Sequence, residues 1–181
     1  MPERESEQQV GKQPSSYVQL AWTSLEHYLR TRQLLPVPDP VPAGMEGQAG
    51  AFVSLKKHGE LRGCIGTIQP VQQNLAGEII NNAVSAGVED PRFWPVQLDE
   101  LAELTISVDV LSPPEPIASE DDLEPKRYGV IVSSRGRVGL LLPNLEGIDS
   151  VAEQVGIARQ KAGLLPDEPV ELARFEVVRY E

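Results

Sequence analysis

The only cysteine of the chain, Cys64, lies in the sequence LRGCIGT at residues 61–67. A thiolate is the nucleophilic form of cysteine and a nearby cation stabilises it, so Arg62, two positions earlier on a predicted strand, is placed to activate Cys64. Glycine inside a strand costs stability and is typical of a bulge or of a place where another group approaches the backbone closely. Gly63 and Gly66, on either side of the cysteine, are therefore candidates for such positions. The opposing interpretation is a packing residue, because unpaired cysteines are among the most buried residue types.

Other groups that could assist a thiol or hold a metal are few. A cysteine–histidine pair requires hydrogen-bond contact, and the chain has only His27 and His58. His58 is five or six strand residues from Cys64, roughly 15 to 20 Å away, and His27 lies on a predicted helix. One cysteine and two distant histidines cannot form a zinc or iron–sulfur site, so we predict no cofactor and no metal held by this chain alone. The acidic run at 120–122 is interpreted as a solvated turn, which leaves open a weak magnesium contact.

A second group of candidate residues is the sequence DPRFWP at 90–95. The proline between Asp90 and Arg92 keeps the backbone extended, so both charges could face one partner. An ion pair that ties this loop to the neighbouring hairpin is an equal alternative, since arginine–carboxylate pairs serve both structure and binding. Phe93 and Trp94 are expected to be apolar anchors of a rigid loop.

Composition limits the class of protein. The chain has 181 residues, 40% of them hydrophobic, and a formal net charge of −11. This length suits one globular unit, and the negative charge disfavours nucleic acid. No apolar run could span a bilayer and the N-terminus has no secretion signal, so we expect a soluble cytoplasmic protein, in agreement with its single free thiol. Residues 1–14 are polar without periodicity and are predicted to be a disordered lead-in.

The strand that carries Cys64 is predicted to belong to a hairpin. Residues 51–57 and 61–68 form two strands with a two-residue turn at 58–59, where glycine supplies a positive φ. This register places Val53 opposite Cys64, so the thiol is expected to face outward between an apolar neighbour and a cation.

The remaining pattern predicts three helices and further strands. The helices begin at Ser15 or Ser16, near Pro70, and at Asp149 or Ser150. The other predicted elements are a proline-rich loop at 35–50, an alternating strand at 103–111, a hairpin whose arms are YGVIVSS and VGLLLP, and a final strand at 172–180. Hairpins separated by helices predict an α+β fold with a mostly antiparallel sheet flanked by helices.

Several of these motifs occur together in one known family. Residues 15–181 resemble an AMMECR-type domain of the AMME chromosomal region family, because they contain motifs of that family in the same order. These motifs are FVSLKKHGELRGCIGTIQP, NNAVSAGVEDPRFWPV, LSPPEPI, GLLLP and KAGL. LRGCIG and DPRF are the specific motifs. The resemblance implies a larger and a smaller lobe with a cleft between them to which LRGCIG contributes. Trp94 departs from the family, in which smaller or apolar residues are common after DPRF.

The resemblance also implies candidates for partners and for site residues. Bacterial and archaeal members often occur with a Memo-type protein and a radical S-adenosylmethionine enzyme in a protein-modification or metabolic system. Three functions follow: an accessory protein that binds a partner or substrate in the cleft, which we prefer; an enzyme or covalent acceptor that uses Cys64; and a nucleic-acid regulator, which the charge disfavours. The candidate residues are Cys64 and Arg62 for catalysis, and Gly63, Ile65, Gly66, Asp90, Arg92, Phe93 and Trp94 for binding.

Overall fold

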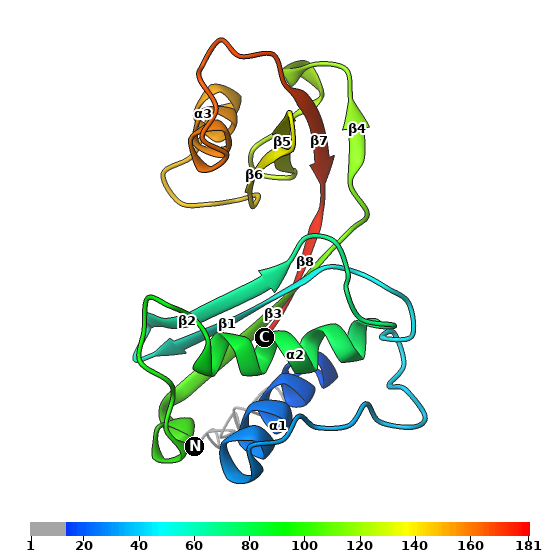
Figure 1. The fold of residues 1–181 in the computed structure, drawn as a ribbon, viewed down its shortest axis with the longest axis vertical. Helices are drawn as coiled ribbons and strands as arrows, with labels where there is room; N and C mark the ends of the chain where they lie inside the picture. The colour runs from blue at the N-terminus through cyan, green and yellow to red at the C-terminus, as the bar shows by residue number, and fades with distance from the viewer. Residues whose placement is uncertain (1–13) are drawn as a thin grey trace, which may run out of the picture.

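The computed structural model describes residues 14–181 and shows two lobes, each built around its own antiparallel sheet (Figure 1). The predicted α+β class with antiparallel strands is confirmed, and the strands are divided over two four-stranded sheets. The predicted lead-in lies outside the described residues, apart from its last residue.

Within residues 14–181, the larger lobe contains two α-helices, one 3-10 helix and four strands. In chain order these are α1 (Ser16–Thr31), β1 (Ala51–Lys57), β2 (Glu60–Thr67), α2 (Leu75–Val88), the 3-10 helix η1 (Leu98–Glu103), β3 (Leu104–Leu111) and β8 (Val177–Tyr180). The strand order is β2-β1-β3-β8, and Figure 1 shows α1 and α2 together on one face of the sheet. These helices and the sheet enclose a hydrophobic core, so the opposite face of the sheet is free to carry polar side chains.

The smaller lobe has a second, separate hydrophobic core. Its elements are β4 (Glu115–Ile117), the 3-10 helix η2 (Glu120–Asp122), β5 (Gly129–Ser134), β6 (Arg137–Leu141), α3 (Val151–Lys161) and β7 (Glu171–Phe175). The strand order is β4-β7-β5-β6, and α3 packs against β5 and β6.

The chain passes between the lobes twice, at Ser112 and at Glu176. The Ser112 amide donates to the Glu176 carbonyl at 2.9 Å, and the Glu176 amide donates to Ser112 Oγ at 2.8 Å. The prediction of one strand over 172–180 was therefore wrong. Because the amide of Glu176 bonds to a side chain between the lobes, the strand is divided there into β7 and β8, which belong to different sheets.

The helices begin where polar side chains cap them. Ser15 accepts the Val18 amide at the start of α1, as predicted. α2 begins at Leu75, later than the predicted start near Pro70, because the Glu78 carboxylate takes the amides that precede the helix. Within residues 14–181, no helix combines the length and apolarity that crossing a membrane requires.

The β1–β2 hairpin has the predicted turn but a different register. His58 and Gly59 form the turn with φ of 52° and 82°. The pairs next to the turn follow the prediction, and then an irregularity at Arg62 shifts the remaining pairs by one residue. The predicted pairing of Val53 with Cys64 was wrong, because Ser54 faces Cys64 and Val53 points into the core.

Candidate functional site

The polar face of the larger sheet carries Cys64. The register aligns Cys64 on β2, Ser54 on β1 and Ser107 on β3 in one row across three strands, on the face away from α1 and α2. Cys64 Sγ lies 3.2 Å from Ser54 Oγ, and all three side chains are half-buried. The thiol is therefore on a partly accessible polar surface and is not part of the apolar core.

The loop that contains DPRF is bonded to the backbone of Cys64. Asp90 Oδ2 accepts the Cys64 amide at 2.9 Å, and Arg92 Nη2 donates to the Cys64 carbonyl at 3.3 Å. Arg92 also binds Asp90 through Nε and Nη2, at 3.0 and 2.8 Å. β2 is an edge strand of its sheet, so the outward amide and carbonyl of Cys64 have no neighbouring strand. The two side chains of the ion pair take the place of that strand, because Asp90 accepts from the amide and Arg92 donates to the carbonyl.

The electrostatics of this pair follow from its hydrogen bonds, which outweigh the effect of burial. Asp90 is 4% exposed. Hydrogen bonds from the Arg92 side chain, together with backbone amides, hold the pKa of Asp90 well below its usual range, although burial opposes them. Of the two alternatives that the sequence left open, the structure shows the ion pair that ties this loop to the hairpin.

Arg62 does not contact the thiol that it was predicted to activate. Its guanidinium binds Glu100 through Nε and Nη2 at 3.2 and 3.1 Å, and Nη1 donates to the Trp94 carbonyl at 2.8 Å. Burial alone would raise the pKa of Glu100, but the Gln97 amide and Arg62 lower it. Arg62 therefore positions the loop between DPRF and η1, away from Cys64.

Arg92 and Arg179 are each held by a buried carboxylate on or beside the polar face of the sheet. Hydrogen bonds to Asp90 and to Asp109 are the main cause of their raised pKa values. Arg179 binds Asp109 through Nε and Nη2, each at 2.8 Å, and Asp109 is 2% exposed. The sequence analysis missed this pair, although Asp109 occupies a polar position of the alternating strand.

The other residues of LRGCIG have packing roles. A Cβ on Gly63 would lie 3.1 Å from the Ala86 carbonyl carbon of α2 and closer still to its oxygen, and a Cβ on Gly66 would enter the ring of Phe52. Ile65 packs against the core of the larger lobe. Close packing therefore explains both glycines, and it is the close approach to the backbone that their position in a strand indicated.

The two aromatic residues of the DPRFWP loop differ in exposure. Phe93 is half-buried, and its ring lies beneath the guanidinium of Arg92 at 5.4 Å. Trp94 is 88% exposed. Phe93 therefore packs against Arg92 of its own loop, whereas the prediction that Trp94 is an apolar anchor was wrong, because its ring is exposed.

The histidines of the chain are not bonded to Cys64. His58 Nε2 lies 2.6 Å from Glu103 at the exposed hairpin turn, and His27 belongs to α1 on the helical side of the sheet. Residues 14–181 contain no group of three or more His, Cys, Asp or Glu side chains placed to hold a metal ion. The described structure therefore gives the thiol no histidine base.

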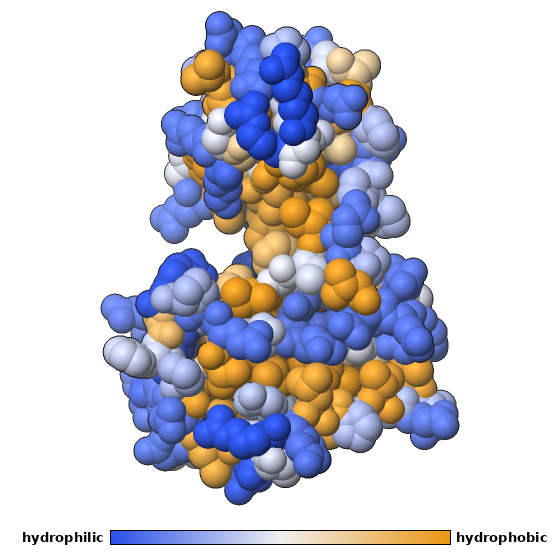
Figure 2. Space-filling view, in the orientation of Figure 1, coloured by the Kyte–Doolittle hydropathy of each residue, from blue (hydrophilic) through white to orange (hydrophobic). Residues whose placement is uncertain are grey.

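A cavity of about 240 Å³ lies where the polar face of the larger sheet meets the smaller lobe. Asp109 and Arg179 line it from the sheet, and Lys126, Arg127 and residues 142–145 line it from the smaller lobe. Figure 2 shows the molecule notched between its lobes. No residue of LRGCIG lines the cavity itself; the motif lies farther along the same face.

Each cation of this cavity has a carboxylate partner. Lys126 binds Asp149 at 2.6 Å and Arg127 binds Glu176 at 2.9 Å, as Arg179 binds Asp109. A guanidinium has five N–H donors, and these pairs use only some of them. The cavity therefore presents fixed hydrogen-bond donors with little net charge.

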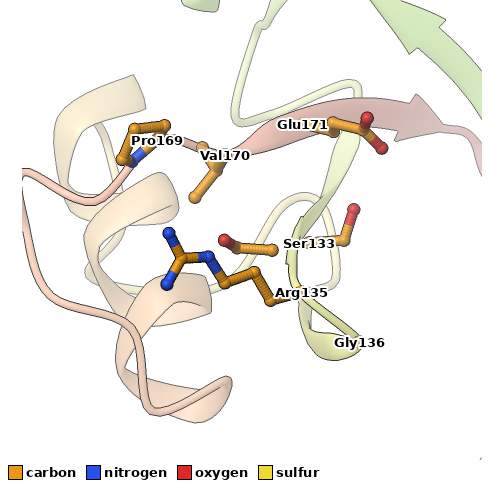
Figure 3. A pocket seen from close by; sticks show the side chains of 7 residues that line it. Ser133, Arg135, Gly136, Pro169, Val170 and Glu171 are labelled. Carbon is orange, nitrogen blue, oxygen red and sulfur yellow. The ribbon is translucent and has the colours of Figure 1, made fainter.

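A second hollow, of about 400 Å³, lies on the smaller lobe at the β5–β6 turn (Figure 3). Ser133, Arg135, Val170 and Glu171 line it, and the figure shows the Arg135 side chain extending toward Val170. The hollow contains none of the residues that the sequence motifs indicated, so it is not the site that the sequence analysis describes.

Comparison with known proteins identifies relatives over nearly the whole chain. The AMMECR1 family matches residues 18–181. A protein from Thermotoga maritima is 48% identical over 95% of this chain and 99% of its own length. Protein CA_C1420 from Clostridium acetobutylicum is 49% identical over 98% of this chain, which spans 38% of that longer protein. The crystal structure of the uncharacterized protein PH0010 from Pyrococcus horikoshii has a TM-score of 0.82 at 33% identity and covers 90% of this chain and 88% of its own.

Proposed function

Because the chain belongs to the AMMECR1 family, we propose that it is an accessory protein that binds a partner or substrate in the cleft between its lobes. In this proposal the protein performs no chemistry of its own. The cleft comprises the 240 Å³ cavity and the polar face of the larger sheet beside it.

One observation carries this proposal: the cationic side chains of the cleft are already held by carboxylates. Arg179 lies on the buried carboxylate of Asp109, and its remaining N–H groups are directed by that contact. Fixed donors lose little entropy on binding, so they favour ligands with carbonyl or carboxylate acceptors. A surface of this kind supports binding better than proton transfer, for which a titrating group near neutral pH is required.

The partners that we propose are a Memo-type protein and a radical S-adenosylmethionine enzyme. The family membership supports this choice, together with the exposed ring of Trp94 beside the DPRF loop. Exposed aromatic and arginine side chains contribute much of the energy of protein interfaces. We also propose a cytoplasmic location, which agrees with a free cysteine.

A second candidate function uses Cys64 as a nucleophile or covalent acceptor. It is supported by the half-buried thiol, its contact with Ser54 and the hydrogen bond of Arg92 to the Cys64 carbonyl. In this function the Cys64 thiolate would attack an electrophilic carbon or a disulfide sulfur of the bound molecule. A new bond to Cys64 Sγ would form, and the leaving group on that carbon, or the other sulfur of the disulfide as a thiolate, would depart.

Site-specific photo-crosslinking tests the proposed cleft. A benzophenone amino acid at Asn144, which is exposed and lines the cavity, is compared with the same group at Leu165, which is 66% exposed and lies outside it. Purified Memo-type and radical S-adenosylmethionine proteins from the same organism serve as partners. We expect a crosslink from position 144 and none from position 165. Binding without a preference for position 144, or no binding by either protein, would refute the proposal.

A further inference from the structure

β3 has an unpaired stretch at its outer edge. β8 pairs only with Val108–Leu111, so residues 104–107 have β1 on one side and no strand on the other among residues 14–181. Four strand residues correspond to about 13 Å of edge. Free edges of this kind are sites where an extended segment of another chain can add a strand.

The direction of the backbone groups shows which of them are free. The Leu111 amide donates to the Gly50 carbonyl on the β1 side, and successive residues alternate, so the N–H and C=O of Ile106 point outward. The Leu104 amide is taken by the Leu101 carbonyl at the end of η1. Ile106 therefore offers a donor and an acceptor in the arrangement that an antiparallel strand uses.

An apolar groove of about 520 Å³ lies beside this edge, on the helical side of the sheet. Val18 and Trp22 of α1 form one wall, and Leu104 and Ile106 of β3 form the other. A residue opposite Ile106 would exchange both backbone bonds with it and direct its side chain into the groove. Tyr180 of β8 provides the precedent, because it pairs with Val108 and stacks on Tyr17 of α1 at 3.9 Å.

Charge and geometry indicate what occupies the groove. Among residues 14–181, its lining includes the carboxylate of Glu181 and no basic side chain, so a cationic segment is favoured. A second copy of the chain fits poorly. Two-fold pairing that used the outward groups of Ile106 would place Leu104 of the second copy opposite Val108, where Tyr180 already pairs.

We propose that the outer edge of β3 binds an extended, basic segment of a partner protein with apolar residues at alternate positions. The segment adds a short antiparallel strand in line with β8. This site lies on the helical side of the sheet and is independent of the cleft, which lies on the opposite face.

A synthetic peptide tests this proposal on the full chain. The probe is fluorescein-labelled KLTLTK-amide, and its control carries N-methyl groups on both leucine amides. We expect saturable binding by fluorescence anisotropy, weaker by about tenfold or more for the control, because N-methylation removes backbone donors that face β3. Equal binding of the two peptides, or no binding of the probe, would overturn the proposal.

Two further measurements separate the occupants of the edge. Hydrogen exchange of the Ile106 amide should be fast in the free protein and slow with the probe. Slow exchange without the probe would overturn the proposal, because it would mean that the edge is already covered. A rate that depends on protein concentration would then indicate a second copy, and a rate that does not would indicate the chain itself. Glu181→Lys should weaken probe binding about two- to five-fold, as for one exposed ion pair. Glu146→Lys, with the same charge change on an exposed loop of the smaller lobe, should not.

Discussion

The substitution Gly63→Ala tests whether the glycine beside the cysteine serves packing or substrate approach. Its new Cβ would lie within 3.0 Å of the Ala86 carbonyl oxygen, a separation that real Cβ atoms essentially never show. The opposing atoms belong to the backbone of α2, so no side chain can rotate away. β2 and α2 would have to separate by roughly 1 Å in a close-packed core.

We expect this change to lower the free energy of unfolding by about 3 kcal/mol, the upper range for overpacking a core. For a chain of this size that corresponds to a decrease in Tm of roughly 6 to 12 °C. Both tryptophans, Trp22 and Trp94, belong to the larger lobe, so urea unfolding followed by tryptophan fluorescence reports on this lobe.

The matched control is Gly47→Ala. Gly47 lies in the same lobe, has no atom within 4 Å of an added Cβ and does not require a positive φ. We expect its stability to change by less than about 0.5 kcal/mol. If Gly63→Ala were as stable as this control, the packing explanation would fail, and the glycine would again be a candidate for contact with substrate.

Three further predictions concern the site. Asp90→Asn should lose about 2 to 4 kcal/mol at pH 7, because charge-assisted bonds to Arg92 and the Cys64 amide are weakened. Since the folded-state pKa of Asp90 is lowered, its stabilisation is complete above the unfolded pKa of about 3.9 and declines as the pH falls below that value. The free energies of unfolding of the two proteins, measured in urea, should therefore converge in acid. A constant difference between them at all pH values would contradict this prediction. Arg62→Ala should raise the pKa of Glu100, measurable by carboxyl NMR, because burial is then opposed by fewer donors; an unchanged value would show that Arg62 does not lower it. Cys64→Ala should change stability by less than about 1 kcal/mol, and Cys64 should be alkylated without denaturant; labelling only after unfolding would make it a packing residue.

The local features of the fold could be predicted from the sequence. Ser15 caps its helix, and residues 58–59 form a turn, because each depends on neighbours within a few positions. The strand at 104–111 alternates, as one buried face requires.

The features that the sequence analysis missed depend on distant residues. The irregularity in β2 accompanies the contact of Arg62 with Glu100, 38 positions away, and Asp109 meets Arg179 across 70 positions. One shifted residue in a strand moves its side chains to the other face, so the surroundings predicted for Cys64 were wrong although the turn was right. An ion pair involving this loop could be predicted from the sequence, because Asp90 and Arg92 are only two positions apart.

The crossings at Ser112 and Glu176 also bear on the order in which the chain folds during synthesis. Every element of the smaller lobe lies between them, so this lobe is a continuous insertion into the hairpin that β3 and β8 form. The larger sheet needs β8, which leaves the ribosome after every element of the smaller lobe, whereas the smaller lobe is complete once Phe175 has emerged. The smaller lobe of the nascent protein can therefore fold before the larger lobe is complete, and the outer edge of β3 has no strand partner until β8 has been made.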